Sequence, residues 1–489
     1  MSASDIAAEP ATTKDTSHKS SRWLALAVLC AGVLMIVLDV TIVNVALPTI
    51  RQNLGFSETT LAWVVNAYLL TSGGFLLLGG RLGDLFGHRR LFLIGITLFT
   101  LASVLCGVAD TQVTLVAARA IQGLGGAIVE AVALSLIVDL FTQTDDRAKA
   151  MGVYGFVCSG GGSIGALLGG FLTNALDWHW IFLVNVPIGA AVIVFSLMLL
   201  PSTPGKGGGR DLDFSGALSI TISLMLAIFA IVNGHEAGWI SLRTLGALGA
   251  AAALLGVFVM IELRVRVPLI PLGMFRLRNL ATANIVGVLW AAAMFAWFFL
   301  SALYLQLVLG YSPLQVGLGF LPTNLVMAAC SLGISARIVI RFGIHIPLVI
   351  GLVLAAAGLL LFARAPVDGN FMMDVLPAML LLGIGAGIAF NPVLMAAMND
   401  VEPSESGLAS GIVNTSFMMG GALGLAVLAS IAASHSDTLI ALGADNRAAL
   451  NGGYHAAFFG GAVFALLAAA VGAAFIRTDP ARAADHKAH

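Results

Sequence analysis

Charged side chains inside apolar segments are the residues of this sequence that could do chemistry. The stretch LVAARAIQGLGGAIVEAVALSLIVD, residues 115–139, is long enough to cross a bilayer, yet it contains Arg119 and Glu130. A charge at bilayer depth costs roughly 2.5–3.5 kcal/mol, so each one needs compensation. Gln122 shares a helix face with Arg119, and Glu130 is about 20° away by helical rotation. We therefore expect all three side chains to point into one polar cavity. Arg119 and Glu130 are about 16 Å apart along the helix, so Arg119 needs a partner on another segment.

A second acid, Asp39, lies about 24 Å along the first apolar segment. An unpaired carboxylate in a low-dielectric medium favours its protonated form. Asp39 and Glu130 are therefore candidates to bind and release a proton as solvent access alternates between two sides. The alternatives are that Asp39 caps an unwound helix end near Pro48, or that Glu130 forms a structural ion pair with an arginine. We expect Glu262 to be solvated near a segment end.

Composition identifies a membrane protein with many spans. The chain has 489 residues, of which 59% are hydrophobic and 10% charged, far from the balance of soluble domains. The formal net charge of -1 offers no basic surface, which argues against nucleic acid as a partner. The four cysteines lie in apolar runs without metal-ligand spacing, so we interpret them as small core residues and expect no metal site.

Fourteen apolar segments are each long enough to span a membrane, at about 20 residues per span. They begin near Trp23, Thr60, Leu91, Val113, Ala148, Trp180, Asp213, Arg243, Leu280, Leu314, Ile346, Met373, Ser404 and Tyr454. With cytoplasmic termini, all of the 24 Lys and Arg residues except Arg51, Arg119, Arg243, Arg364 and Arg447 fall on the cytoplasmic side. The positive-inside rule therefore favours this orientation.

The breaks between segments divide the chain into two bundles joined by an inserted helix pair. PSTPGKGGGRDLD, residues 201–213, is a flexible break after segment six, and ELRVRVPLIPLGMFRLRNL, residues 262–280, is a basic break after segment eight. We expect an all-α integral membrane protein with two six-helix bundles and two inserted helices. The expected parts are a tail (1–22), the first bundle (23–200), linkers with the inserted pair (201–279), the second bundle (280–476) and a second tail (477–489).

GGRLGDLFGHRR follows segment two, and SARIVIRFG follows segment ten at the corresponding place in the second half. Such half-repeats are expected of transporters. The first stretch resembles the loop motif of the major facilitator superfamily. It matches that motif at Gly80, Leu82, Asp84, Gly87 and Arg89, whereas Gly83 and Leu85 depart from it. Asp84 is placed to pair with a neighbouring helix N-terminus and so to latch the bundles.

Further motifs resemble the fourteen-span drug:proton antiporter branch of that superfamily. Residues 115–125 are similar to its fourth-span motif, in which the arginine, here Arg119, is tied to proton transfer. LDVTIVNVALPTI (38–50) and WHWIFLVNVPIG (178–189) are similar to segments of the same branch. Its antiporter motif is met by a stripe of small residues, although Ala166 stands where the motif has proline; simple helix packing is an equal interpretation. This stripe is Gly161, Gly165, Gly169 and Gly170.

The second bundle offers polar and aromatic side chains rather than acids. Apolar walls with a few orienting polar groups suit an amphipathic organic substrate, although such aromatics also pack or face lipid. With Gln122, the candidate contacts are Asn284, Trp290, Trp297, Tyr304, Gln306, Asn324, Asn391, Asn414 and Met418.

The resemblance implies proton-coupled export of hydrophobic or amphipathic compounds by alternating access, with the proton gradient as energy source and no cofactor. We expect a monomer in the plasma membrane. An enzyme is disfavoured, because GGSIG around Ser163 lies inside a span and PGKGGGR lacks the spacing of a phosphate-binding loop. The alternatives are a dedicated metabolite exporter, a proton symporter, and a sensor on a transporter scaffold.

Overall fold

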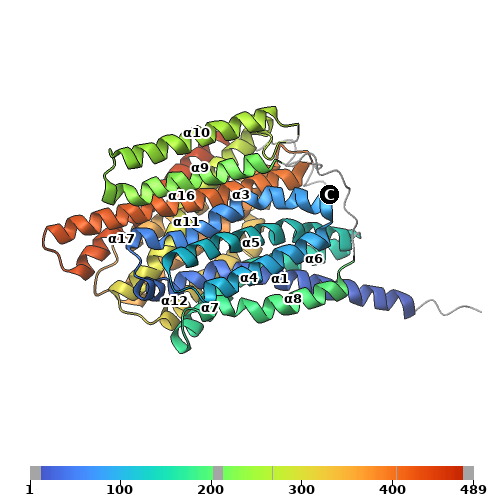
Figure 1. Ribbon diagram of the computed structural model, residues 1–489, viewed down its shortest axis with the longest axis horizontal. Helices are drawn as coiled ribbons and strands as arrows, with labels where there is room; N and C mark the ends of the chain where they lie inside the picture. Colours follow the sequence, from blue (N-terminus) through green and yellow to red (C-terminus); the bar gives the residue numbers. More distant parts are fainter. Residues whose placement is uncertain (1–12, 142, 202–212, 267, 403–404, 477–489) are drawn as a thin grey trace, which may run out of the picture.

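The computed structural model describes residues 13–141, 143–201, 213–266, 268–402 and 405–476. Every regular element within these ranges is a helix (Figure 1). In the described part of the chain, thirteen helices are long and apolar enough to cross a membrane. The remaining predicted span corresponds to α6 (Thr144–Ala175), whose 32 residues make a helix about 48 Å long. The prediction of an all-α membrane protein is confirmed.

The other elements follow one another with short connections. They are α1 (Thr13–Leu54), α2 (Glu58–Leu61), α3 (Trp63–Phe86), α4 (His88–Gly107), α5 (Gln112–Leu140), α7 (Trp180–Leu183), α8 (Asn185–Leu199), α9 (Phe214–Ala237), α10 (Leu242–Arg264), η1 (Leu272–Arg276), α11 (Arg278–Leu303), η2 (Tyr304–Val308), α12 (Pro313–Ala329), η3 (Cys330–Ser335), α13 (Ala336–Phe342), α14 (His345–Phe362), η4 (Phe371–Val375), α15 (Leu376–Met398), α16 (Ser406–Ala441) and α17 (Asn446–Phe475).

Most helices begin within a few residues of their predicted starts, but α17 begins eight residues before the expected Tyr454. Residues 13–22, expected as part of a tail, are helical and extend α1, because polar residues without Gly or Pro do not end a helix. The predicted start at Ser404 lies outside the described residues. So do residues 202–212 of the predicted flexible break, and the predicted tail 477–489.

Local sequence explains several helix ends. Ser57 and Ser312 each form a capping box at a helix start, which satisfies backbone donors that have no partner inside the helix. Gly87 separates α3 from α4 with φ +93°, a conformation that glycine adopts at no steric cost. The loop motif therefore needs a glycine at this position to turn the chain from one helix into the next.

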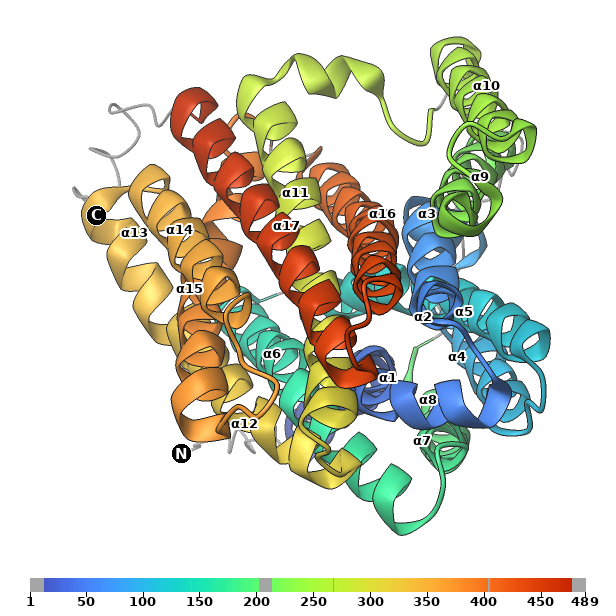
Figure 2. The same cartoon turned by 90° about the vertical axis from the view of Figure 1, so that its left-hand side faces the viewer.

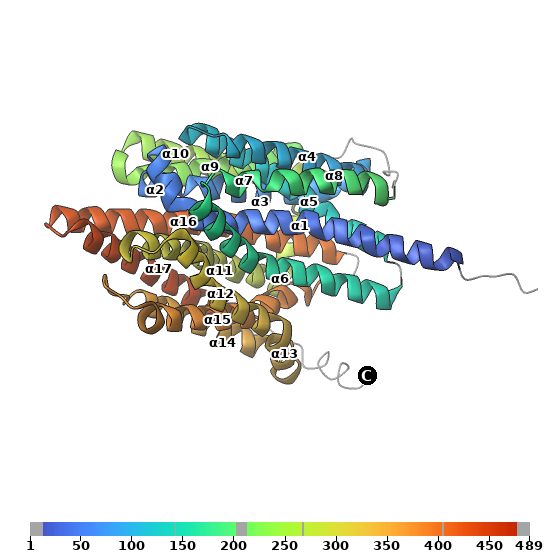
Figure 3. The same ribbon diagram turned by 90° about the horizontal axis from the view of Figure 1, so that it is seen from below.

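The helices form two groups with the inserted pair at one side. Helices α1 to α8 pack with one another, as do α11 to α17. The pair α9 and α10 stands outside both groups (Figure 2), where α9 packs against α3 and α16. Most of α10 is exposed. α1 begins and α17 ends at the same end of the molecule (Figure 3), as an even number of spans requires.

The two groups meet closely at one end of the α6–α12 seam and separate at the other. A Cβ atom on Gly317 of α12 would lie 2.5 Å from the carbonyl oxygen of Ala166 on α6, and one on Gly170 would lie 2.5 Å from that of Pro313. Toward the end where α6 begins, a Cβ atom on Gly152 or Gly155 would meet nothing within 4 Å. This seam is therefore closed at the end where α6 finishes and open at the end where the chain begins.

Candidate functional site

Asp39 and Arg119 form an ion pair in the interior of the first group of helices. Asp39 on α1 is 0% exposed and Arg119 on α5 is 1% exposed. Arg119 Nη1 donates to Asp39 Oδ2. Asp39 Oδ1 also accepts hydrogen bonds from Gln122 Nε2, at 2.7 Å, and from Asn185 Nδ2 of α8, at 3.0 Å. The acid is therefore held by donors from two other helices.

Other polar atoms of this network also have partners. Arg119 Nε donates to the carbonyl oxygen of Val64 at 3.0 Å, and its Nη1 donates to Gln122 Oε1 at 2.6 Å. Gln122 Nε2 donates to Ser103 Oγ at 2.9 Å. The guanidinium group lies over the ring of Tyr68, with its carbon 4.5 Å from the ring centroid, which adds a cation–π attraction. Such additional hydrogen bonds offset the cost of burying a charge pair.

The network corrects three predictions made from the sequence. Asp39 has a partner, so the picture of an unpaired acid is wrong; nor does it cap an unwound end, because α1 runs through Pro48 to Leu54. Gln122 is 0% exposed and fully used within the network, so it is not open to a substrate in this conformation. Arg119 and Gln122 are enclosed rather than lining one cavity with Glu130. The expected partner for Arg119 on another span is present.

Glycines on α5 allow the network to form. A Cβ atom on Gly123 would lie 2.5 Å from the carbonyl oxygen of Tyr68 on α3, and one on Gly125 would lie 2.6 Å from the backbone nitrogen of Phe99 on α4. Real Cβ contacts do not come this close. The glycines of the fourth-span motif therefore bring three helix backbones together, so that Arg119 reaches across to α1.

The glycine stripe of α6 packs mainly against α1. A Cβ atom on Gly161 would lie 2.8 Å from Val37 Cγ1, one on Gly165 would lie 2.9 Å from the carbonyl oxygen of Leu38, and one on Gly169 would meet Ile42. Only Gly170 turns to the other group, against Pro313. Three members of the stripe thus seat α6 on the two turns of α1 around Asp39.

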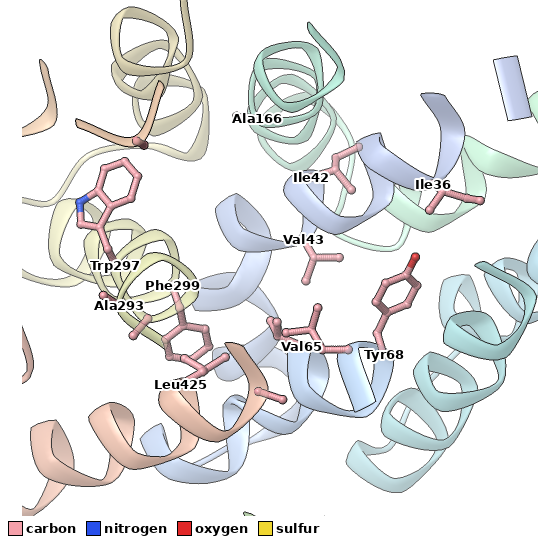
Figure 4. Close-up of a cluster of buried hydrophobic side chains, with 14 of the residues drawn as sticks. Ile36, Ile42, Val43, Val65, Tyr68, Ala166, Ala293, Trp297, Phe299 and Leu425 are labelled. Carbon is pink, nitrogen blue, oxygen red and sulfur yellow. The ribbon is translucent and has the colours of Figure 1, made fainter. Parts of the chain in front are cut away.

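Glu130 lies apart from the ion pair and is half-buried. The structure gives it no hydrogen bond or ion pair with any described residue, so the alternative of a structural pair with an arginine is not supported. Tyr68 lies between the two sites and projects from α3 into the interior (Figure 4). A Cβ atom on Gly126, one turn before Glu130, would lie 2.7 Å from the Tyr68 hydroxyl oxygen. That hydroxyl is buried and has no hydrogen-bond partner in the part of the chain that the structure describes.

Asp84, His88 and Arg89 of the loop stretch make their contacts within the first group of helices, whereas Arg81 bonds Pro268 in the segment after α10. His88 lies between two acids, with Nε2 3.2 Å from Asp84 Oδ1 and Nδ1 3.2 Å from Asp139 Oδ2. Arg89 donates to the carbonyl oxygen of Leu197 at 2.6 Å. The predicted latch from Asp84 to a helix of the other bundle is therefore not formed in this conformation. Gly80 faces Ala131 of α5 at ordinary contact distance.

Most of the candidate contacts in the second group of helices are structural here. Trp290 and Trp297 are 1% and 2% exposed. Trp297 packs among Phe298, Phe320 and Phe362. In Figure 4 its side chain points away from Leu425. The Tyr304 hydroxyl donates to the carbonyl oxygen of Pro366. These three aromatic residues are therefore core residues in this conformation.

The amide side chains of the same set differ in their exposure. Asn284 and Asn324 are buried. Gln306 Nε2 donates to the carbonyl oxygen of Val45 on α1 at 2.8 Å and thus links the two groups. Asn391 donates to the carbonyl oxygen of Ser331 at 2.8 Å. Asn414 on α16 is exposed.

Asn414 lies on the face of α16 that meets the first group. Its neighbours at helical spacing are Gly411, whose added Cβ atom would meet Leu77 of α3, and Met418, whose Cβ atom faces Gly73. An exposed amide between two such contacts can reach a molecule that enters between the groups.

Sequence reasoning missed two sets of residues. Asn185 and Tyr68 complete the ion-pair network. Asn185 lies in the apolar run of residues 178–189, where a lone amide indicates a buried hydrogen-bond partner. A single tyrosine such as Tyr68 gives no comparable signal.

Three phenylalanines from different helices also form a cluster. Phe417 lies 5.8 Å from Phe295 and 6.2 Å from Phe390, measured between ring centroids. Their separation in sequence hides this cluster until the fold is known.

Comparison with known proteins agrees with this architecture. The sequence profile of the Major Facilitator Superfamily matches residues 29–425. The puromycin resistance protein pur8 of Streptomyces alboniger is 40% identical, over 84% of this chain and 82% of its own length. The cephamycin export protein CmcT of Amycolatopsis lactamdurans is 36% identical, over 93% and 92%. The multidrug resistance protein Stp of Mycobacterium tuberculosis is 35% identical, over 85% and 76%.

Solved structures share the fold at low sequence identity. The POT family transporter PepTSo has a TM-score of 0.68 at 16% identity and covers 92% of this chain and 97% of its own. A bacterial homologue of the human lysosomal transporter Spinster, in an inward-facing and unoccupied conformation, has a TM-score of 0.66 at 17% identity, over 94% and 99%. These similarities concern the helical arrangement alone.

Proposed function

Because this chain belongs to the Major Facilitator Superfamily, we propose that it exports drug-like organic compounds in exchange for protons. It is a multi-pass membrane transporter and not an enzyme, and it is similar to drug and antibiotic resistance exporters. Alternating access between its two groups of helices would carry the substrate across. The proton coupling, the site residues and the orientation are the parts of the proposal that experiments must test.

The observation that carries the coupling proposal is the buried ion pair between Asp39 and Arg119. A proton arriving on Asp39 removes its negative charge and leaves Arg119 as an unpaired buried cation, which is strongly unfavourable. Asp39 receives hydrogen bonds from α5 and α8, and α1 is packed on α6 through the glycine stripe. Breaking the pair would therefore release α1 from its neighbours and favour a different helix arrangement.

Glu130 is the acid through which a proton would enter or leave this region. It is half-buried and has no partner among the described residues, so it can take up a proton without first breaking an ion pair. The Tyr68 hydroxyl, which no described residue bonds, lies one helical turn away, on the side of Arg119. We propose that Glu130 exchanges protons with the open end of the molecule and that Tyr68 separates it from the ion pair.

The proposed substrate site lies between the two groups of helices. Phe390, 48% exposed, and Phe417 form part of an aromatic cluster on the second group, and Asn414 on the same helix as Phe417 is exposed. Aromatic walls with a few polar groups bind amphipathic molecules without strict shape selection. The relatives named for puromycin, cephamycin and multidrug resistance suggest antibiotics as the first compounds to test.

We propose that both termini lie in the cytoplasm of a cell whose plasma membrane contains the protein as a monomer. The excess of Lys and Arg at the end of the molecule where α1 begins supports this orientation. The open end of the α6–α12 seam would then face the cytoplasm, where an exporter receives its substrate. A bound cofactor has no part in this cycle.

The energy balance is favourable for a single proton. One charge entering at 100 mV brings about 2.3 kcal/mol. Moving a neutral drug out against a tenfold gradient needs about 1.4 kcal/mol. One titrating carboxylate per cycle is therefore enough to drive export.

Purified protein in liposomes with an imposed pH step tests this proposal directly. The side of the membrane that corresponds to the cell exterior is made acidic. Puromycin should then move from the cytoplasmic side of the protein to the acidic side, and a protonophore should stop this movement. Movement in the same direction as the proton would identify a symporter instead. Transport that continues at the same rate after collapse of both the pH step and the voltage would contradict proton coupling altogether.

A further inference from the structure

Two further acids lie buried at one end of the inserted helix pair. Asp213 caps the start of α9, and Glu262 stands in the last turn of α10. Because α9 and α10 are antiparallel neighbours, both acids lie at the same end of the pair. Asp213 is 2% exposed and Glu262 is 4% exposed, so the expectation that Glu262 is solvated is wrong. Neither acid belongs to the site around Asp39.

Each of these carboxyl groups uses one oxygen and leaves the other without a donor. Asp213 Oδ1 accepts from the backbone nitrogen of Gly216 at 2.7 Å and from Ser215 Oγ at 2.9 Å. Glu262 Oε2 accepts from the backbone nitrogen of Ile270 at 3.2 Å. Asp213 Oδ2 and Glu262 Oε1 are both buried and have no donor among the described residues.

The two carboxyl groups act on each other electrostatically, and the oxygens that lack a donor are both buried at the same end of the helix pair. Two ionised carboxylates placed in this way repel, and neither has a hydrogen to donate. One shared proton removes one charge and supplies the missing donor. A hydrogen-bonded carboxyl–carboxylate pair is therefore the arrangement that satisfies the geometry.

We propose that Asp213 and Glu262 form a proton-binding site, separate from the transport acids, that holds the segment after α10 in place. Glu262 fixes this segment through Ile270. Arg81 of the loop motif fixes it from α3 through a hydrogen bond from Nη2 to the carbonyl oxygen of Pro268, at 2.5 Å. The segment leads through η1 into α11, so the site connects the loop motif with the second group of helices.

Groups from several described elements surround the pair. Asp213 from α9 and Arg81 from α3 are the charged groups of described residues that act on Glu262, while Arg264 and Arg266 extend into solvent. A small apolar cluster covers this region, formed by Leu78, Ala217 and Leu269 with Phe75, Leu82 and Ile270 against it. Among the described residues, Arg81 is the cation that acts on Glu262, and one positive charge does not offset two carboxylates.

Infrared difference spectroscopy on the purified full-length protein tests this site. Raising the pH from 6 to 9 should remove a protonated-carboxyl band in the unmodified protein, and both Glu262→Gln and Asp213→Asn should abolish that band. Glu130→Gln should keep it, which separates this site from the proposed transport acid. A band of unchanged area in both variants would overturn the proposal.

Thermal unfolding in detergent provides a second readout. Deprotonation leaves two negative charges that repel each other, so the unfolding midpoint of the unmodified protein should fall as the pH rises. Gln at 262 or Asn at 213 supplies an amide donor in place of the proton, and each variant should show a flatter pH profile while it still folds. Variants with the same pH profile as the unmodified protein would also overturn the proposal.

Discussion

Arg119 reaches from α5 to Asp39 on α1, 80 residues away in sequence, and neither side chain is exposed. Burying two charges costs several kcal/mol for each ion, and only complete pairing offsets this cost. The donors from Gln122 and Asn185 complete the pairing of Asp39. The pair is therefore stable while both charges are present and becomes strongly unfavourable when one of them is neutralised.

The first prediction concerns the coupling between these two residues. Asp39→Asn and Arg119→Gln should each destabilise the fold by about 3–5 kcal/mol, because each leaves one buried charge unpaired. The double variant leaves no charge and should recover a large part of that loss. Unfolding midpoints of the three purified variants measure the interaction directly.

Transport in the same variants provides the functional control. The double variant should be folded and inactive in proton-driven efflux, since it has no group to titrate at position 39. Losses that simply add in the double variant would mean that the two charges do not depend on each other. Active efflux by the double variant would remove Asp39 from the coupling mechanism.

The second prediction concerns Glu130. Glu130→Gln should lower pH-driven efflux at least tenfold while leaving folding unchanged, because the residue has no partner among the described residues. Asp110→Asn is the matched control, since Asp110 is an exposed acid in the loop directly before α5, the helix that carries Glu130. Efflux rates measured between pH 6 and 8 should lose their pH dependence only in the Glu130 variant. Equal rates in both variants would exclude Glu130.

The third prediction concerns the closed end of the α6–α12 seam. Gly317→Ala places a Cβ atom 2.5 Å from the backbone of Ala166, so it should open this end and shift the conformational equilibrium. Gly155→Ala lies on α6 toward the open end of the seam and meets nothing within 4 Å, so it should have no such effect. The rate at which a thiol reagent labels a single cysteine introduced in place of Pro313 measures how open this end of the seam is in each variant. Equal labelling in both variants would show that this contact does not control closure.

Parts of the fold and the site follow from sequence because they depend on local chemistry. The span of residues 115–139 and the need of Arg119 for a partner on another helix follow from the cost of a buried charge. The turn at Gly87 and the glycine stripe of α6 follow from the loop and antiporter motifs. These features reflect constraints that act within a few turns of one helix.

Other features depend on which helices become neighbours, and a single sequence does not encode that locally. The choice of Asp39 as partner for Arg119 required the packing of α1 against α5. The burial of Glu262 required Asp213 and the segment around Ile270 to fold over it. The same reason explains why Trp290 and Trp297 proved to be core residues while the cluster around Phe417 went unnoticed.

The fourth prediction concerns that aromatic cluster as a wall of the substrate site. Phe390 packs edge-to-face against Phe417 of α16, with ring centroids 6.2 Å apart, yet it is 48% exposed. Phe390→Ala should raise the KM for an amphipathic substrate about 2- to 10-fold, which is the range expected for one aromatic contact. Its effect on KM should differ between substrates, because each presents a different apolar surface to the ring.

Phe459 on α17 provides the matched comparison, since it is 58% exposed and lies on a helix without a proposed substrate contact. Phe459→Ala removes the same ring and should leave KM unchanged for every substrate. Efflux assays with puromycin and with a lipophilic cation measure both variants side by side. A rise in KM for Phe459→Ala equal to that for Phe390→Ala would mean that loss of an exposed ring, rather than loss of a substrate contact, causes the effect, and the substrate site would then have to lie elsewhere between the two groups of helices.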